Sequence, residues 1–356
     1  MSHELDFTKG NAAIAYTGDV PWHGYGQEME ESQPLERWII EAGMDYDVIR
    51  RPVSYINNRI IDAAGEVISD TSPEVLVAQS EQGLFDMPKF TPVKNKVSLH
   101  RSDTNDQLAI VSPNYKIVQP REIMEFFREL IDDQGFNMHT AGVLADGKRV
   151  WALAETGKDF VIPGTQDQLG GYLLLATSYD GKFSTTAQFT SIRVVCNNTL
   201  SWSLDKGDSQ DTGIVRIPHM SEFQAQRVKS ELGLLGEDGW TQFQDNVIKL
   251  SEVTVTKRQA VEFFLELLGV NEEEAAAGKQ LINAKKLIAF YESGPGSDFV
   301  TSKNTTWGLV NAVSFFTDHG RRAHNTGTRF NSAAFGEGAV MKKRAFTKAL
   351  ELAEAA

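Results

Sequence analysis

Residues 138–154 read MHTAGVLADGKRVWALA, and residues 172–189 read YLLLATSYDGKFSTTAQF. In each stretch an Asp-Gly pair, Asp146-Gly147 or Asp180-Gly181, lies between two runs rich in apolar and β-branched residues. Asp-Gly suits a type I′ turn because both central residues of that turn need a positive φ. The two stretches therefore predict antiparallel hairpins, with strands at 138–144 and 149–154, and at 172–178 and 183–189.

The segments around these hairpins have mostly helical spacing. Pro120 opens a segment with an apolar stripe, and Gly135 is placed to end it. Thr256-Lys-Arg-Gln259 has the form of a capping box at the start of another helix. The other predicted elements are a hairpin of strands 97–100 and 108–111, short strands near 46–49 and 60–63, and helices over 32–43, 192–204, 222–235, 240–250, 275–291, 307–316 and 339–353.

Antiparallel strands with separate helices predict an α+β fold. We expect an antiparallel sheet of long hairpins with segregated helices, followed by a mostly helical C-terminal region. The polar, glycine-containing stretch 205–213 is the clearest boundary. The predicted organisation is an N-terminal arm with a small α/β region over 1–88, a central antiparallel core over 89–205, and a helical region over 206–356 that contains a basic segment at 300–348.

The composition is that of an acidic globular protein. The 356 residues include 48 acidic and 35 basic side chains, for a formal net charge of −13. This balance argues against a protein coated in positive charge for duplex DNA. The single cysteine, Cys196, excludes an internal disulfide framework. No apolar run reaches the ~20 residues of a membrane span, and the N-terminus lacks the layout of a signal peptide. We expect a cytoplasmic protein with no membrane partner.

The charge is unevenly distributed along the chain. Between Val300 and Lys348 there are eight basic and two acidic residues, a balance of +6, whereas the first 299 residues carry −17. Aromatic residues lie among these cations, a combination typical of sequence-tolerant single-strand binding. The alternatives are a solvated helix face with a buried apolar stripe, and a dock for the acidic remainder of the chain. Arg193, near a predicted hairpin, is expected to meet a phosphate or one of the many carboxylates. The candidate nucleic-acid-binding residues are Arg193, Arg321, Arg322, Arg329, Lys342, Lys343 and Arg344.

The common enzyme signatures are missing from the sequence. There is no phosphate-binding P-loop, no Gly-rich dinucleotide turn, no G-x-S-x-G elbow and no H-E-x-x-H pair. His319 and His324 are five residues apart, a spacing that does not place two ligands on one helical face. Cys196 has no obvious partner base, which favours a small buried side chain over a nucleophile. We therefore expect no catalytic residue, no bound metal and no cofactor.

The segment Tyr16–Gly26 stands apart because it combines glycines with an amphipathic pair, Trp22 and His23. Its structural interpretation is an N-terminal arm that places Trp22 in a groove of its own domain or of a neighbouring subunit. We favour this contact over a catalytic role for His23.

The motifs resemble those of a known family. Pro21-Trp22-His23-Gly24-Tyr25-Gly26 resembles the PWHGLG signature of the phage/plasmid-like protein family classed as domain of unknown function 932, with Tyr25 in place of leucine. Asp180-Gly181 followed by residues 193–200, RVVCNNTL, resembles its central block, with Asn197 in place of a more usual glutamine. The match continues through 101–120, His219, 294–296, 306–308, Asn311-Ala312, Asp318-His319 and Phe335-Gly336.

This resemblance implies a phage, prophage or plasmid setting and no established activity. The order of hairpins and helix is also similar to the core of Rad52-like single-strand annealing proteins, which implies rings or filaments that hold DNA by its backbone. The first hypothesis is thus a single-stranded-DNA-binding and annealing protein that acts as a homo-oligomer. The alternative is an acidic, non-enzymatic interaction protein that binds a host or phage protein. A metal-dependent nuclease or phosphodiesterase around His319 is the third.

Overall fold

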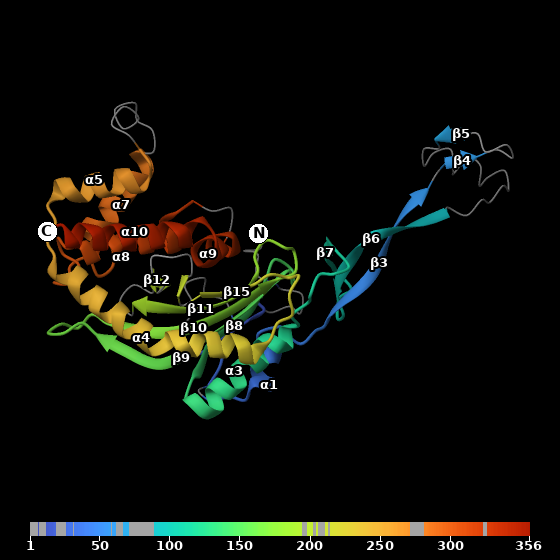
Figure 1. Ribbon diagram of the computed structural model, residues 1–356, viewed down its shortest axis with the longest axis horizontal. Helices are drawn as coiled ribbons and strands as arrows, with labels where there is room; N and C mark the ends of the chain where they lie inside the picture. Colours follow the sequence, from blue (N-terminus) through green and yellow to red (C-terminus); the bar gives the residue numbers. More distant parts are fainter. Residues whose placement is uncertain are drawn as a thin grey trace.

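The computed structural model confirms the α+β fold with a large antiparallel sheet. It describes residues 6, 12–18, 26–30, 32–57, 59–61, 67–70, 89–193, 198–201, 204–205, 211–212, 214–270, 281–322 and 326–356. Eight of the described strands form one sheet in the order β12-β11-β10-β9-β8-β1-β2, with β15 also paired to β11 (Figure 1). Its strands are β1 (Ile14–Tyr16), β2 (Gln27–Glu28), β8 (Asn137–Leu144), β9 (Arg149–Val161), β10 (Gln168–Ser178), β11 (Thr185–Arg193), β12 (Asn198–Ser201) and β15 (Ile214–Ile217).

Both predicted hairpins form, but their turns differ. In the β8–β9 connection Asp146 and Gly147 have φ of 56° and 90°, which confirms the positive-φ turn. The β10–β11 connection spans residues 179–184 and is longer than a two-residue turn, although Gly181 does have a φ of 69°. An Asp-Gly pair therefore marks both hairpin ends, while only the first hairpin has the tight turn.

The sheet buries both of its faces. Alternate residues of β10 belong to different cores, since Leu173 and Leu175 join the main core cluster whereas Leu174 and Ala176 join a second one. Period-two alternation of side chains produces this division. Helices α1 (Leu35–Glu41) and α3 (Pro120–Gln134) lie on one side of the sheet, and α9 (Thr326–Phe335) lies on the other (Figure 1).

Local signals define the ends of α3 as predicted. Pro120 is the first residue of the helix, and Gly135 follows its last turn with a φ of 72°. The Gln119 amide N–H donates to Glu122 at 2.7 Å, and the Gln119 side-chain oxygen accepts from the Val48 N–H at 2.8 Å. The start of the helix is thereby tied to a neighbouring strand.

The C-terminal region is mostly helical, as expected. The capping box at Thr256 is present, and its hydroxyl accepts from the Gln259 N–H. The helices predicted at 222–235 and 240–250 form one continuous helix, α4. The helices are α4 (Ala225–Glu252), α5 (Lys257–Leu267), α7 (Leu281–Ser293), α8 (Thr306–Phe315) with the π-helical turn η1 (Phe316–Gly320), and α10 (Glu337–Glu354).

The prediction of a helix over residues 192–204 is wrong. The chain continues in β11 as far as Arg193 and returns as β12, where Thr190 pairs with Ser201 and Ile192 with Thr199. The short strand β13 (Leu204–Asp205) pairs with β14 (Asp211–Thr212). The β-branched residues of this segment find partners in the sheet edge, and tertiary pairing outweighs the local helical spacing. Cys196 lies outside the described residues.

A long two-stranded ribbon extends away from the body (Figure 1). It consists of β3 (Val48–Asn57) paired with β6 (Lys89–Arg101), and we call this pair the β-arm. Strand β7 (Gln107–Val111) pairs with the base of β6, as the predicted hairpin requires. Strands β4 (Arg59–Ile61) and β5 (Val67–Asp70) pair with each other at its far end (Figure 1). The sequence patterns predicted only short strands here, not a ribbon of this length.

The main core cluster draws on residues from Ala13 to Ala353 and so includes all three predicted parts of the chain. The boundaries at 88 and 205 stay a prediction. In the described part of the chain, no helix is both long and apolar enough to cross a membrane.

Candidate nucleic-acid interface

A groove of about 650 Å³ lies between α10 and the sheet. One wall is the side of α10, and the other is formed by β11 and β15, with the end of α9 at one side. We call this space the basic groove. Its lining segments, 183–188, 214–216 and 334–351, are far apart in sequence and meet only through the fold.

The α10 wall follows from helical periodicity. Lys343, Thr347 and Glu351 are four residues apart and line the groove as one row, with Arg344 and Lys348 in the adjacent row. The other side of the helix carries small residues such as Ala345 and Ala349, both fully buried. The small residues let α10 pack closely against the neighbouring helices, and Lys343, Arg344 and Lys348 line the groove.

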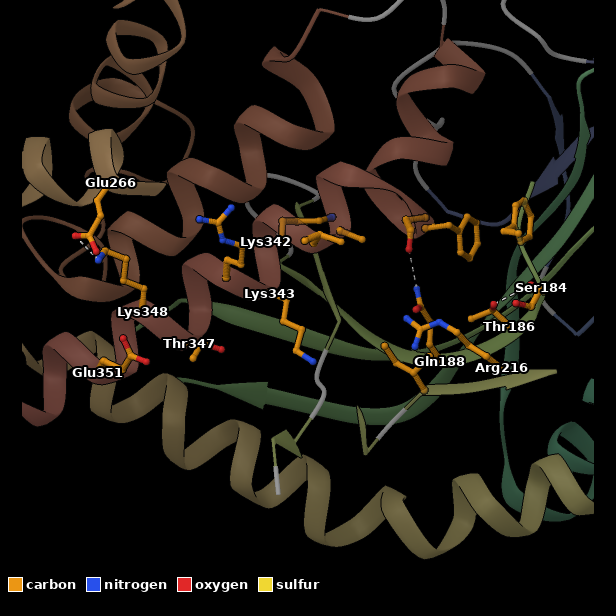
Figure 2. Close-up of a pocket in the computed structure, with 17 residues that line it drawn as sticks. Ser184, Thr186, Gln188, Arg216, Glu266, Lys342, Lys343, Thr347, Lys348 and Glu351 are labelled. Atoms are coloured by element: carbon orange, nitrogen blue, oxygen red, sulfur yellow. Dashed lines mark hydrogen bonds and ion pairs between the residues drawn. The ribbon is translucent and has the colours of Figure 1, made fainter. Parts of the chain in front are cut away.

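The sheet wall follows from strand register. Thr186 pairs with Arg216, and Gln188 pairs with Ile214. Directly paired residues project from the same face of a sheet, and all four line the groove. Figure 2 shows Arg216 from the sheet and Lys343 from α10 projecting into the space between them. The Gln188 amide donates to the Ala334 carbonyl oxygen at 3.3 Å, which ties the sheet to α9.

Two aromatic rings form one end of the groove. Phe183 and Phe335 stack with ring centroids 4.7 Å apart and planes 7° from parallel. Behind Phe183, the His219 Nε2–H donates to the Phe183 carbonyl oxygen at 2.8 Å, and the His219 ring stacks on Tyr115. Burial lowers the pKa of His219, which favours the neutral form of its imidazole ring. The aromatic end is thereby held in place by uncharged contacts.

The groove lining is predominantly basic. It contains five Lys or Arg residues, which are Arg216, Lys342, Lys343, Arg344 and Lys348, and two acidic ones, Glu266 and Glu351. Lys348 forms an ion pair with Glu266 at 2.5 Å, so its charge is largely compensated. Arg216 and Arg344 are exposed and Lys343 is half-buried. These three cations line the groove together with Glu351.

Arg193 does not fit the phosphate-binding role predicted for it. Its side chain is only 2% exposed, and its Nε and Nη2 atoms donate to the two carboxylate oxygens of Asp167, each at 2.6 Å. Nη2 also donates to the Ser302 hydroxyl at 2.9 Å, and the Thr301 hydroxyl donates to Asp167 at 2.6 Å. Arg193 therefore joins the sheet to the segment before α8 as half of a buried ion pair. This is the carboxylate alternative raised in the sequence analysis.

The other predicted cations divide into three groups. Lys342 is 3% exposed and donates to the Asp318 carboxylate at 2.8 Å, which anchors α10 to η1. Arg321 forms an ion pair with Glu337 and also contacts Ser332. Lys343 and Arg344 line the basic groove, and their contact with nucleic acid stays a prediction. Arg322 is exposed and Arg329 is half-buried, and neither lines the groove.

Arg216 is a groove residue that the sequence analysis missed. It alternates with Val215 and Ile217 in β15, and its position opposite Thr186 could not be inferred without the register. The predicted contact residues Trp22 and His23 lie outside the described residues.

The Asp318-His319 pair does not converge on one point. The Asp318 carboxylate accepts from Lys342, whereas the His319 ring lies 4.7 Å from the ring of Phe315. Among the described residues, no group of three or more His, Cys, Asp or Glu side chains lies close enough to hold a metal ion.

Comparison with known proteins yields a family but no activity. A family model described as "Domain of unknown function (DUF932)" matches residues 107–335. The matched stretch includes both hairpins, α4, α8 and the aromatic end of the groove, and it stops before α10. No curated protein matches the chain, and no solved structure matches it.

Proposed function

The chain belongs to the DUF932 family, and from that premise we propose that it binds single-stranded nucleic acid along the basic groove. The observation that carries the proposal is the combination of Arg216, Lys343 and Arg344 with the Phe183–Phe335 aromatic pair in one groove. Cations that follow a backbone together with aromatic rings that stack on bases are the two elements of sequence-tolerant single-strand binding.

The two walls suit a phosphate backbone. Arg216 approaches from the sheet and Lys343 from α10 (Figure 2), so a strand between them is contacted from both sides. Arg344 also lines the groove. Each neutralised phosphate releases condensed counterions, which makes such binding favourable at low salt even for an acidic protein.

The size of the groove favours one strand over two. About 650 Å³ falls in the range of roughly 300–1,000 Å³ that accommodates a drug-sized ligand. A short segment of single strand fits such a space, whereas a whole duplex does not. The proposal includes annealing by an oligomer of this chain, because strands held by their phosphates leave base edges available for pairing.

The test is fluorescence anisotropy of a labelled single-stranded DNA 60-mer at 50 to 200 mM salt. The groove variant carries Arg216→Gln, Lys343→Gln and Arg344→Gln. Three phosphate contacts correspond to a salt slope of about −2, or roughly a 20-fold loss of affinity over this salt range. We expect the groove variant to lose a slope of about 2 and to bind about 10-fold or more weakly at 50 mM salt.

The matched control carries Arg227→Gln, Lys257→Gln and Arg258→Gln. It removes the same charge from α4 and α5 at side chains that are 73%, 79% and 87% exposed and that do not line the groove. Equal behaviour of the groove and control variants, or no binding by the unsubstituted protein at micromolar concentration, would refute the proposal.

A further inference from the structure

The β-arm carries a concentration of positive charge that the groove does not include. Its two strands, VIRRPVSYIN and KFTPVKNKVSLHR, contain six Lys or Arg residues and no Asp or Glu. The whole chain has a net charge of −13, so these 23 residues leave −19 on the rest of the molecule. The two paired strands are thus basic, although Arg101 at their base is buried in ion pairs with Asp6 and Asp103. The segment 58–88, which joins the strands, contains six acidic residues and one arginine.

A bulge in the ribbon contains two of these cations, Lys94 and Lys96. Pro52 pairs with Val97 and Ser54 pairs with Pro92, so four residues of β6 lie opposite the single residue Val53. A bulge bends its strand and redirects side chains. Lys94 and Lys96 lie within this bulge and are exposed, together with Asn95 between them.

Arg51 extends the same cluster from the opposite strand. It is exposed and lies next to Pro52, whose partner Val97 follows Lys96. Among the described residues, none of Arg51, Lys94 and Lys96 has an ion-pair partner. The three cations are therefore available to an external anion.

Two aromatic side chains are exposed further along the arm. Tyr55 is 54% exposed and Phe90 is 65% exposed. Tyr55 pairs with Thr91 and Phe90 pairs with Ile56, so the two rings project from opposite faces of the ribbon. The arm therefore combines exposed aromatic rings with exposed cations, as the basic groove combines the Phe183–Phe335 pair with Lys and Arg side chains.

The geometry of the arm separates its charge from the acidic body. Lys94 lies seven positions before Arg101 at the base, which corresponds to roughly 20 Å of strand at ~3.3 Å per residue. The Debye length is ~8 Å at physiological ionic strength. The field of the body is therefore largely screened at the bulge, where Arg51, Lys94 and Lys96 are exposed.

The residues at the edges of the arm favour binding of a ligand through side chains over pairing with an added β-strand. Pro52 and Pro92 lie in the paired strands and lack an N–H, and Lys94 and Lys96 follow Pro92 in the same strand. Proline and lysine are the residues that prevent an exposed edge from pairing with another chain. A second copy that extended the sheet would be opposed by both features.

We propose that the β-arm is a second contact for single-stranded nucleic acid, in which Arg51, Lys94 and Lys96 bind phosphates and Tyr55 and Phe90 stack on bases. This inference rests on the proposed function for its class of ligand, but it depends on a separate set of residues. Two such sites on one chain let a long strand engage both, and the second contact then forms at a high effective concentration.

The test uses the full chain and a single-stranded DNA 60-mer in the same anisotropy titration. The arm variant carries Arg51→Gln, Lys94→Gln and Lys96→Gln, which are exposed positions where the substitution preserves folding. We expect its salt slope to fall by about 2 relative to the control variant on α4 and α5. Tyr55→Ala and Phe90→Ala should each weaken binding about fivefold or more, since a stacked base contributes ~1–3 kcal/mol.

Photocrosslinking locates the contact directly. An oligonucleotide that contains 5-bromouracil should crosslink to peptides that include Tyr55 or Phe90, and the crosslink should persist in the groove variant.

The outcomes separate the two proposals. Normal binding by the arm variant together with weak binding by the groove variant would overturn the arm site and leave the proposed function intact. Weak binding by the arm variant alone would support the arm and refute the groove. A change in the light-scattering mass of the arm variant without DNA, with unchanged affinity, would identify the arm as a contact between copies and overturn this inference.

Discussion

At the scale of single residues, burial decides what each cation does. Arg193 and Lys342 are basic residues like Arg344, yet both are nearly completely buried and each forms an ion pair with an aspartate. Arg344 is exposed on α10 and lines the groove. Desolvated charges require partners, so the buried cations stabilise the fold, whereas Arg344 is exposed to solvent at the groove.

This distinction predicts a large cost for breaking the buried pair. Asp167→Asn leaves the Arg193 charge buried and uncompensated, and we expect a loss of about 3–5 kcal/mol in the free energy of unfolding. Urea denaturation measures it. Glu262→Gln breaks the exposed Arg258–Glu262 pair and should cost about 0.5 kcal/mol or less. Similar losses in the two variants would show that the Arg193–Asp167 pair is not the structural element described here.

At the scale of elements, the same dipeptide acts differently in different surroundings. Asp-Gly ends both hairpins, but the β8–β9 turn is tight and packs against the interior, whereas the β10–β11 connection is longer and open. A Cβ on Gly147 would lie 2.7 Å from Arg101 Cδ, and a Cβ on Gly181 would meet nothing within 4 Å. The Tyr46 hydroxyl also donates to the Gly147 carbonyl oxygen at 3.1 Å.

The two glycines should therefore respond differently to alanine. Gly181→Ala adds only the strain of a positive φ, about 1–2 kcal/mol. Gly147→Ala adds the same strain and a clash with Arg101, which is buried in ion pairs with Asp6 and Asp103. Overpacking of this kind costs a further ~1–3 kcal/mol. Thermal unfolding of the two variants measures the difference, and equal melting temperatures would contradict this account of the turn.

At the scale of the whole molecule, core and arm are separate. Among the described residues, the two core clusters contain no residue between Val48 and Leu99 along the chain. The arm beyond its base thus contributes charge and exposed aromatic surface, while the body contains the buried apolar residues that stabilise the fold.

This separation predicts that the arm can be removed without unfolding the body. Replacing residues 53–96 by Asn-Gly joins the paired residues Pro52 and Val97 through a two-residue hairpin turn. We expect the melting temperature to stay within about 4 °C of the unsubstituted protein, since a change of 1 kcal/mol shifts it by ~2–4 °C in a chain of this size class. Calorimetry provides the measurement, and loss of the cooperative transition would show that the arm belongs to the folding unit.

The candidate site could be predicted only in part. Lys343 and Arg344 were found because the basic segment is visible as a local excess of charge. Arg216 was missed because nothing in the sequence around β15 marks the residue that faces the groove. The cations of the β-arm were missed for a related reason, since they are spread over two strands that lie about 40 residues apart along the chain and meet only by pairing.

The sequence by itself determined the features that depend on neighbouring residues: the hairpin turn at Asp146-Gly147, the limits of α3 at Pro120 and Gly135, the capping box at Thr256, and the acidic balance with its basic exceptions. Only the tertiary structure decided which cations are buried against aspartates, which line a groove and which lie on an arm. The physical reason is the distance along the chain over which each kind of interaction acts. Turn and cap preferences act over a few residues, whereas burial and charge pairing join residues such as Asp167, Arg193 and Ser302, which only the folded chain brings together.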